Sequence, residues 1–339
     1  MTPLARAADA FLEASVVGSF SRIGISVRSR LLPEFTDGSG PASAGRVAVI
    51  TGATSGIGLA AASELARRGW NIYFLARNPE RAERAMATIG SAAGGGSGGT
   101  VGYGIADLED QDSVRAFASE FRRAHGRLDV LVHAAGAIHQ RFGVNHAGIE
   151  LTVAGQLVTP FLLTKLLFPA LLAAAPSRVI TVSSGGMYAQ RLDPATLEMA
   201  PSGYRGVVAY ARVKRAQVVL SREWARRIDP AEVAFHAMHP GWADTPGIAA
   251  ALPRFRWAAR PILRTPEQGA DTIVWLATAA PECLGSGCFW HDRRPRPEYR
   301  LPWTREDDPA AARHLWESID RAAGSLSRPG PPAVRSAVP

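Results

Sequence analysis

A tyrosine and a lysine spaced four residues apart, Tyr210 and Lys214, are the side chains best suited to acid–base chemistry. The chain uses arginine for almost every basic residue, so its two lysines, Lys165 and Lys214, mark positions where guanidinium would not serve. Residues four apart share one helix face, so the ammonium would lower the pKa of the phenol from about 10 toward neutrality. A phenol of this kind can act as general acid or base. The pair alone is weak support, because such pairs are more often surface contacts.

A glycine-rich turn supplies the second signal. The apolar, β-branched run 46–51 predicts a buried strand, and a helical pattern follows the turn and ends near Gly69. Strand, glycine turn and helix together are typical of a site that holds a dinucleotide's phosphates at a helix N-terminus. A glycine-rich loop without this role is the less favoured interpretation. The turn residues expected at the cofactor are Gly52, Thr54, Ser55, Gly56, Ile57 and Gly58.

These motifs occur in the order T-G-x-x-x-G-x-G and then Y-x-x-x-K, and the chain therefore resembles the short-chain dehydrogenase/reductase family. Four further matches follow expected strands: Asp107-Leu108, Ala134-Ala135-Gly136, Val182-Ser183-Ser184 and Pro240-Gly241. The resemblance covers residues 45 to 292, and segments 179–187 and 238–247 are most similar to the dehydrogenase/reductase member 12 branch. It implies an α/β fold: a single Rossmann-type, doubly wound parallel sheet of about seven strands, flanked by helices.

The resemblance also implies a role for each catalytic position. Tyr210 would exchange the proton at the substrate oxygen, and Lys214 would lower the tyrosine pKa and hold the nicotinamide ribose. Ser184, the second serine of the strand-end pair, would hydrogen-bond the substrate oxygen, and Gln156 would occupy the relay position. Further residues expected at the cofactor are Asp107, Leu108, Ala134, Ala135, Gly136, Pro240, Gly241 and Thr245.

Three features depart from the family pattern. His133 replaces an asparagine that commonly braces the sheet, and it is expected to be a core residue rather than an acid or base. Gln156 stands where asparagine is usual and reaches one methylene further, while Asn145 lies too far upstream to fill that position. The long separation of Ser184 from Tyr210 predicts an inserted loop over residues 187–206.

Arg77 decides the expected cofactor. NAD-dependent proteins usually place a carboxylate after the second strand, but this chain has Arg77-Asn78 there and no acid before Glu80. Because an arginine can pair with a 2′-phosphate, we expect NADP(H) to be preferred, with NAD(H) as the alternative. The competing interpretation is an ordinary exposed arginine.

The favoured function is an NADP(H)-dependent oxidoreductase acting on a lipophilic carbonyl or alcohol. The expected lid, residues 242–265, interleaves apolar side chains with arginines, which indicates an apolar substrate with an acidic group, a nearby membrane surface, or ordinary packing. A weakly catalytic, dinucleotide-binding regulator is the alternative. A sugar-nucleotide epimerase or dehydratase is disfavoured, since those proteins usually need a larger C-terminal domain.

Composition and charge restrict the possible partners and cellular location of the protein. The 339 residues carry a net charge of +8, but the arginines are scattered and no nucleic-acid motif accompanies them, so we expect no nucleic-acid partner. No pattern of further metal ligands accompanies Cys283 and Cys288 in the sequence, so no metal site is expected. Two cysteines do not make a disulfide framework, which indicates a reducing compartment. We find no bilayer-length apolar run and no secretory signal, and expect a cytoplasmic protein, peripheral at a membrane if bound to one.

The chain divides into a core and flanking segments. Residues 1–44 predict an amphipathic helical extension and linker that packs on the core or, less favoured, lies at a membrane surface. The Rossmann domain spans 45–300, a helical extension 301–328, and a disordered tail 329–339. The apolar segment 157–172 could serve either the core or a homo-oligomer interface.

Overall fold

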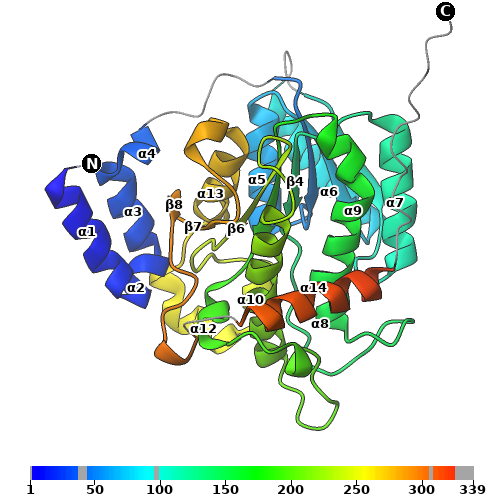
Figure 1. Ribbon diagram of the computed structural model, residues 1–339. Helices are drawn as coiled ribbons and strands as arrows, with labels where there is room; N and C mark the ends of the chain where they lie inside the picture. The colour runs from blue at the N-terminus through cyan, green and yellow to red at the C-terminus, as the bar shows by residue number, and fades with distance from the viewer. Residues whose placement is uncertain (1, 37–43, 95–98, 305–307, 325–339) are drawn as a thin grey trace, which may run out of the picture.

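The computed structural model describes residues 2–36, 44–94, 99–304 and 308–324. The expected tail 329–339 lies outside these ranges, as do residues 37–43 of the expected N-terminal extension and linker. An eight-stranded sheet runs through the centre in the order β3-β2-β1-β4-β5-β6-β7-β8 (Figure 1). Its strands are β1 Val47–Thr51, β2 Asn71–Ala76, β3 Val101–Ile105, β4 Val130–His133, β5 Ser177–Val182, β6 Val233–Met238, β7 Phe289–His291 and β8 Arg294–Pro295.

Seven strands are parallel, and only β8 runs antiparallel to its neighbour β7. The doubly wound parallel sheet is thus confirmed, with one short strand more than expected. The strand order reverses between β1 and β4, the place where such sheets open a crevice for ligands. β1, β4 and β6 are buried throughout, as strands covered on both faces must be.

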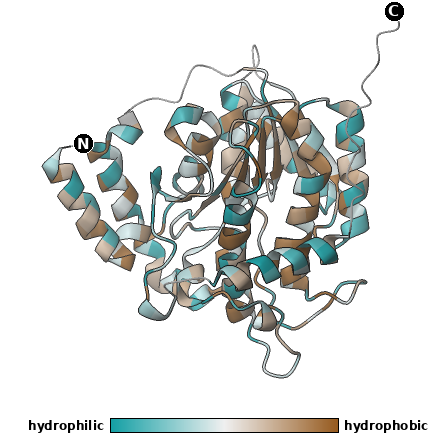
Figure 2. Ribbon diagram, viewed as in Figure 1, coloured by the Kyte–Doolittle hydropathy of each residue, from teal (hydrophilic) through white to brown (hydrophobic). Residues whose placement is uncertain are grey.

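Two helical layers cover the sheet, and Figure 2 shows the strands at its centre as strongly hydrophobic. The helices are α5 Gly56–Arg67, α6 Pro79–Ala93, α7 Gln111–Ala124, α8 Leu151–Val153, α9 Thr159–Leu172, α10 Gly206–Ala225, α13 Pro266–Thr278 and α14 Pro309–Ala323. One core cluster joins the sheet to α5, α6 and α13, and the other joins the opposite face to α7, α9, α10 and α14.

The helical stretch Leu151–Leu172 corrects one expectation. It is long and apolar enough to cross a bilayer, but 72% of its apolar window is buried inside the protein, so it is a core helix. A π-helical turn, Ala154–Val158, separates α8 from α9 within it. Such turns widen a helix locally and are frequent at functional sites.

The C-terminal helix α14 covers the outer side of α9 and α10. Trp316 packs against Phe161 and Trp224 with ring centroids 4.9 Å and 4.8 Å away, and Arg227 lies over the same indole ring. Lys165 of α9 is also hydrogen-bonded to Asp320. Core packing and α14 therefore bury much of the apolar segment 157–172.

The N-terminal segment forms four short helices rather than one: α1 Pro3–Ala14, α2 Val16–Phe20, α3 Arg22–Leu31 and α4 Pro33–Thr36. Serines at the breaks cap the next helix, since Ser15 accepts from Gly18 N and Ser21 from Ile23 N. These helices pack on the side of the molecule that carries β7 and β8 (Figure 1).

The lid and loops complete the fold. The lid region contains α11 Pro246–Ala251, α12 Pro253–Ala259 and the turn Arg260–Ile262. Short 3₁₀ turns lie at Gly185–Ala189 and Pro194–Thr196 in the inserted loop, and at Pro281–Cys283 and Pro302–Thr304 nearer the C-terminus.

Candidate active site

A cavity of about 690 Å³ opens at the carboxyl ends of the central strands. Every residue that the sequence predicted for catalysis or cofactor binding lines it, although the residues come from separate segments of the chain. These are Gly52, Thr54, Ser55, Gly56, Ile57, Gly58, Arg77, Asp107, Leu108, Ala134, Ala135, Gly136, Gln156, Ser184, Tyr210, Lys214, Pro240, Gly241 and Thr245.

The glycine turn places backbone without side chains at the N-terminus of helix α5. Gly52 has φ +74° and lies so close to Ala135 that an added Cβ would come within 2.8 Å of its backbone. Gly58 is equally constrained, because a Cβ there would lie 2.4 Å from the Gly52 carbonyl oxygen. Ser55 occupies the N-cap position of α5, but its side chain makes no capping hydrogen bond. The first backbone N–H groups of the helix are therefore open toward the cavity. These features fit a bound pyrophosphate.

Tyr210 and Ser184 meet at the deep end of the cavity. The Ser184 hydroxyl hydrogen-bonds Tyr210, and this bond lowers the pKa of the phenol. Burial has the larger and opposite effect, and raises the pKa of Tyr210 to about 12. The expected acidification of the tyrosine by Lys214 is therefore wrong for the protein without a bound ligand.

The environment of Lys214 explains this result. Its Nζ lies 5.2 Å from the centroid of the Tyr210 ring, but it donates to Val182 O at 2.9 Å and to Gln217 Oε1 at 3.0 Å. Burial also lowers the pKa of Lys214 to about 7, so the ammonium is only partly populated near neutrality. The charge that would stabilise a phenolate is consequently weak and directed elsewhere.

The π-helical turn places Gln156 beside the lysine. Its Nε2 donates to Ala137 O at 2.7 Å, and its backbone carbonyl accepts from Gln217 Nε2 at 2.7 Å. Gln156 Oε1 is buried without a partner among the described residues, next to Gly136 and Lys214. An unpaired acceptor beside an ammonium with a third N–H to donate fits a ribose hydroxyl or a water molecule.

His133 is a core residue, as expected. It is buried on β4, Nε2 lies 2.9 Å from Thr164 Oγ1, and burial lowers its pKa to about 3. Thr51 Oγ1 braces the neighbouring strand ends by accepting from the backbone N–H groups of Ala134 and Ala135, both at 3.1 Å. Although the asparagine is missing, the Thr51 hydroxyl still connects the ends of β1 and β4.

Arg77 lies at the end of β2 with 68% of its side chain exposed. It forms long ion pairs with Asp107 and Glu109, at 3.6 Å and 3.9 Å. Asn78 and Arg81 also line this part of the cavity. Arg81 is a second cation that the sequence analysis did not single out, although it lies four residues after Arg77.

His239 and Phe20 are two further residues that the sequence analysis missed. His239 lines the cavity beside Gly185, and both of its ring nitrogens are buried without a partner among the described residues. Phe20 packs edge-on against its ring, 4.3 Å between centroids, and also contacts Trp242 at the start of the lid. The N-terminal extension thus supports the wall of the cavity. Nothing in the sequence pairs Phe20 with a residue more than 200 positions away.

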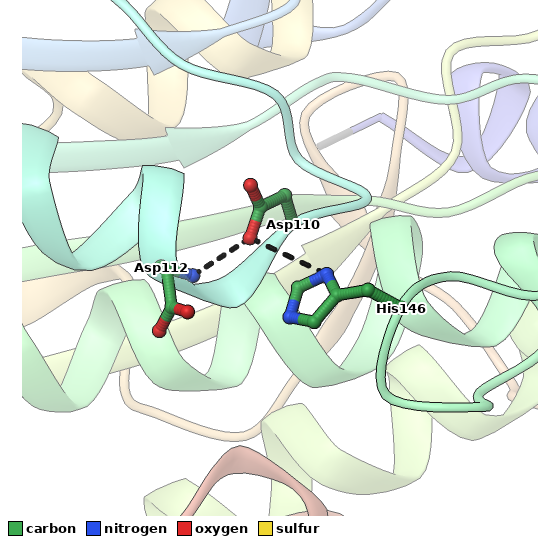
Figure 3. A group of neighbouring side chains, drawn as sticks. All are labelled: Asp110, Asp112 and His146. Atoms are coloured by element: carbon green, nitrogen blue, oxygen red, sulfur yellow. Dashed lines mark hydrogen bonds and ion pairs between the residues drawn. The ribbon is translucent and has the colours of Figure 1, made fainter.

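Asp110, Asp112 and His146 bring their potential metal-ligand atoms within 4.8 Å of one another on the surface (Figure 3). The Asp110 carboxylate already accepts from the Asp112 backbone N–H at 2.9 Å, where it caps α7, and lies 3.7 Å from His146 Nδ1. Helix capping is sufficient to account for this cluster.

Comparisons with known proteins identify the family. The short chain dehydrogenase family profile matches residues 46–253. Dehydrogenase/reductase SDR family member 12 from Bos taurus is 39% identical over 82% of this chain and 86% of that protein. Retinol dehydrogenase 14 from Mus musculus is 34% identical over 83% of this chain and 87% of its own. The chain belongs to the short-chain dehydrogenase/reductase family, and its resemblance to the member 12 branch is confirmed.

A solved structure from Beutenbergia cavernae shares the fold. It is provisionally named an NAD(P)-dependent gluconate 5-dehydrogenase and has NADP bound at low occupancy. It is 29% identical with a TM-score of 0.61, covering 75% of this chain and 97% of that one. Fold and relatives together define this chain as an oxidoreductase of the short-chain class.

Proposed function

We propose that the protein transfers hydride between NADP(H) and a carbonyl or alcohol group of a lipophilic substrate. The observation that carries the proposal is the meeting of Ser184, Tyr210 and Lys214 in the same cavity as the open N-terminus of α5. The glycine turn would hold the pyrophosphate, and Gln156 with Lys214 would hold the nicotinamide ribose.

The chain's own residues would handle the proton. During reduction, Tyr210 gives its phenolic proton to the substrate oxygen while Ser184 stabilises the charge that develops there. Lys214, whose Nζ lies 5.2 Å from the centroid of the Tyr210 ring, would return a proton toward the phenolate, and Gln217 holds its ammonium. When bound, the nicotinamide supplies or accepts the hydride and, in its oxidised form, adds a positive charge that favours phenolate.

Two arginines support NADP(H) over NAD(H). Arg77 and Arg81 line the cavity where the adenosine ribose would lie, and the ion pairs of Arg77 with Asp107 and Glu109 are long, so a 2′-phosphate could replace them. The bound NADP in the related Beutenbergia cavernae structure agrees with this assignment.

The lid favours an apolar substrate. Trp242, Ile248 and Phe255 line the cavity, and Trp242 packs edge-on against Phe255 with 5.3 Å between centroids. His239 is the buried polar group that could recognise a single oxygen among these apolar surfaces. The name of the related retinol dehydrogenase 14 fits a substrate of this kind.

The experiment that tests the proposal follows nicotinamide absorbance with NADPH or NADP⁺ and a panel of long-chain aldehydes, aromatic ketones and lipid alcohols. We expect turnover with at least one apolar compound and little with short polar ones. Dinucleotide binding without oxidation or reduction across the panel would contradict the proposal. It would instead support the regulatory alternative.

A further inference from the structure

The N-terminal helices turn an apolar surface toward solvent. Leu4 and Phe11 are two helical turns apart on α1 and are 73% and 79% exposed, with the exposed Ala7 between them. Val16, Val17 and Ile23 extend the exposed apolar set onto α2 and α3. The extension therefore packs on the core with one face and leaves a second apolar face uncovered among the described residues.

Charges are sorted between these two faces. The acidic residues Asp9 and Glu13 point inward, where Arg28 makes ion pairs with them at 2.8 Å and 2.9 Å. Arg296 adds a pair with Asp9 at 2.7 Å. Glu34, the remaining acid of residues 2–36, is only partly exposed, whereas Arg22 and Arg30 are exposed. The outward side is thus apolar and cationic without an exposed carboxylate.

The lid helix α12 continues this composition. Trp257 is 83% exposed, Arg254 and Arg260 are exposed, and the only acid of the lid, Asp244, is paired with Arg256 at 2.6 Å. A chain of aromatic contacts joins α2 to α12, because Trp242 packs between Phe20 and Phe255. The extension and the lid are therefore in contact through Trp242.

We propose that this combined face, formed by Leu4, Phe11, Val16, Val17, Ile23 and Trp257 with Arg22, Arg30, Arg254 and Arg260, binds the surface of an anionic lipid bilayer. Apolar side chains with a tryptophan suit the interfacial zone, and arginines around them suit acidic headgroups. A symmetric contact with a second copy fits less well, since it would bring arginines together with no exposed acid to pair them. Docking would place the lid and cavity mouth at the membrane, where a lipid-soluble substrate is concentrated.

Vesicle sedimentation of the full chain tests the proposal and requires no turnover. We expect binding to phosphatidylcholine vesicles that contain roughly 30–40% phosphatidylglycerol. Binding to vesicles of pure phosphatidylcholine, or to the anionic vesicles in high salt, should be much weaker. Phe11→Ser and Trp257→Ser should each weaken binding about tenfold, since each removes an inserted aromatic ring. Leu172→Ser, an exposed apolar residue on α9, should leave it unchanged.

Two results would overturn the proposal. One is that the protein binds neutral and anionic vesicles equally, or binds neither. The other is Phe11→Ser converting a dimer into a monomer in light scattering while vesicle binding is absent, which would assign the face to self-association. Because vesicle binding is measured without substrate, its failure is distinguishable from failure of the proposed oxidoreductase function.

Discussion

Tyr210 and Lys214 occupy successive turns of α10, yet the lysine ammonium is hydrogen-bonded to Val182 and Gln217 rather than to the phenol. The tyrosine is bonded to Ser184 instead, and its pKa rises to about 12. The free protein therefore holds its acid in the protonated form, which suits proton donation during reduction. Phenolate formation would depend on a positively charged ligand nearby.

Gln217 should control turnover through Lys214. Gln217→Leu removes one acceptor from the ammonium, so the already lowered pKa of Lys214 should fall further. We expect kcat to drop about tenfold and the basic arm of its pH profile to move to lower pH. Gln190→Leu, a glutamine outside the cavity, is the control. A lower rate with an unchanged profile would indicate a structural defect only.

Arg77 should set cofactor preference. Arg77→Ala removes a charge beside the expected 2′-phosphate, and we predict a loss of about 10- to 100-fold in kcat/KM for NADPH with little change for NADH. Arg84→Ala, an exposed arginine on the helix α6 that follows and outside the cavity lining, should change neither value. Unaltered discrimination in Arg77→Ala would remove the assigned role.

Arg28 should hold the N-terminal extension on the core. It is fully buried and contacts Asp292 at 2.7 Å as well as the acids of α1, while Arg264 of the lid reaches the same Asp292 at 2.6 Å. Arg28→Met leaves carboxylates incompletely paired and should cost about 3 kcal/mol of unfolding free energy.

The same substitution should release residues 2–36 to protease before the sheet unfolds. Limited proteolysis with mass spectrometry measures this, and the exposed Arg30→Met is the matched control. Equal cleavage rates for Arg28→Met and Arg30→Met would show that the ion pairs do not anchor the segment.

Acid should destabilise the protein through buried histidines. Burial lowers the pKa of His133 and His236 to about 3 and of His291 to about 4, so each stays neutral in the fold while the unfolded chain takes up protons below about pH 6.5. Stability is therefore present above this pH and is lost as pH falls toward the folded pKa values.

His133→Asn isolates one of these contributions. Its loss of unfolding free energy between pH 7.5 and pH 5 should be smaller than that of the unsubstituted protein by about 2 kcal/mol, because one proton-uptake site disappears from the unfolded chain. Urea titrations at both pH values measure the difference, with the exposed His314→Asn as control. Identical pH dependence in both variants would contradict burial as the cause.

The sequence predicted the sheet and the cavity lining because both depend on local patterns. Buried β-branched runs and glycines 52, 56 and 58 directly encode the strands and the turn. The extra strand β8 escaped prediction because it has two residues and follows a turn in which Asp292 and Arg293, neither a glycine, adopt positive φ. Serines 15 and 21 did carry a capping signal for the broken N-terminal helix, which the apolar spacing obscured.

Electrostatics at the site could not be predicted from spacing. Spacing places Lys214 on the same helix face as Tyr210, but its hydrogen bonds depend on a strand-end carbonyl and on Gln217, and its pKa depends on burial. The role of Phe20 likewise rests on contacts between distant segments. Such contacts form only when the extension docks on β7 and the lid.

The most direct test of the account is single-turnover hydride transfer by Tyr210→Phe with saturating NADPH and a substrate turned over by the unsubstituted protein. Loss of the phenolic proton donor bonded to Ser184 should reduce the rate by about 10²- to 10⁴-fold, with the calorimetric Kd for NADPH almost unchanged. A rate within tenfold of the unsubstituted protein, with cofactor bound normally, would contradict the assignment of Tyr210 as the acid.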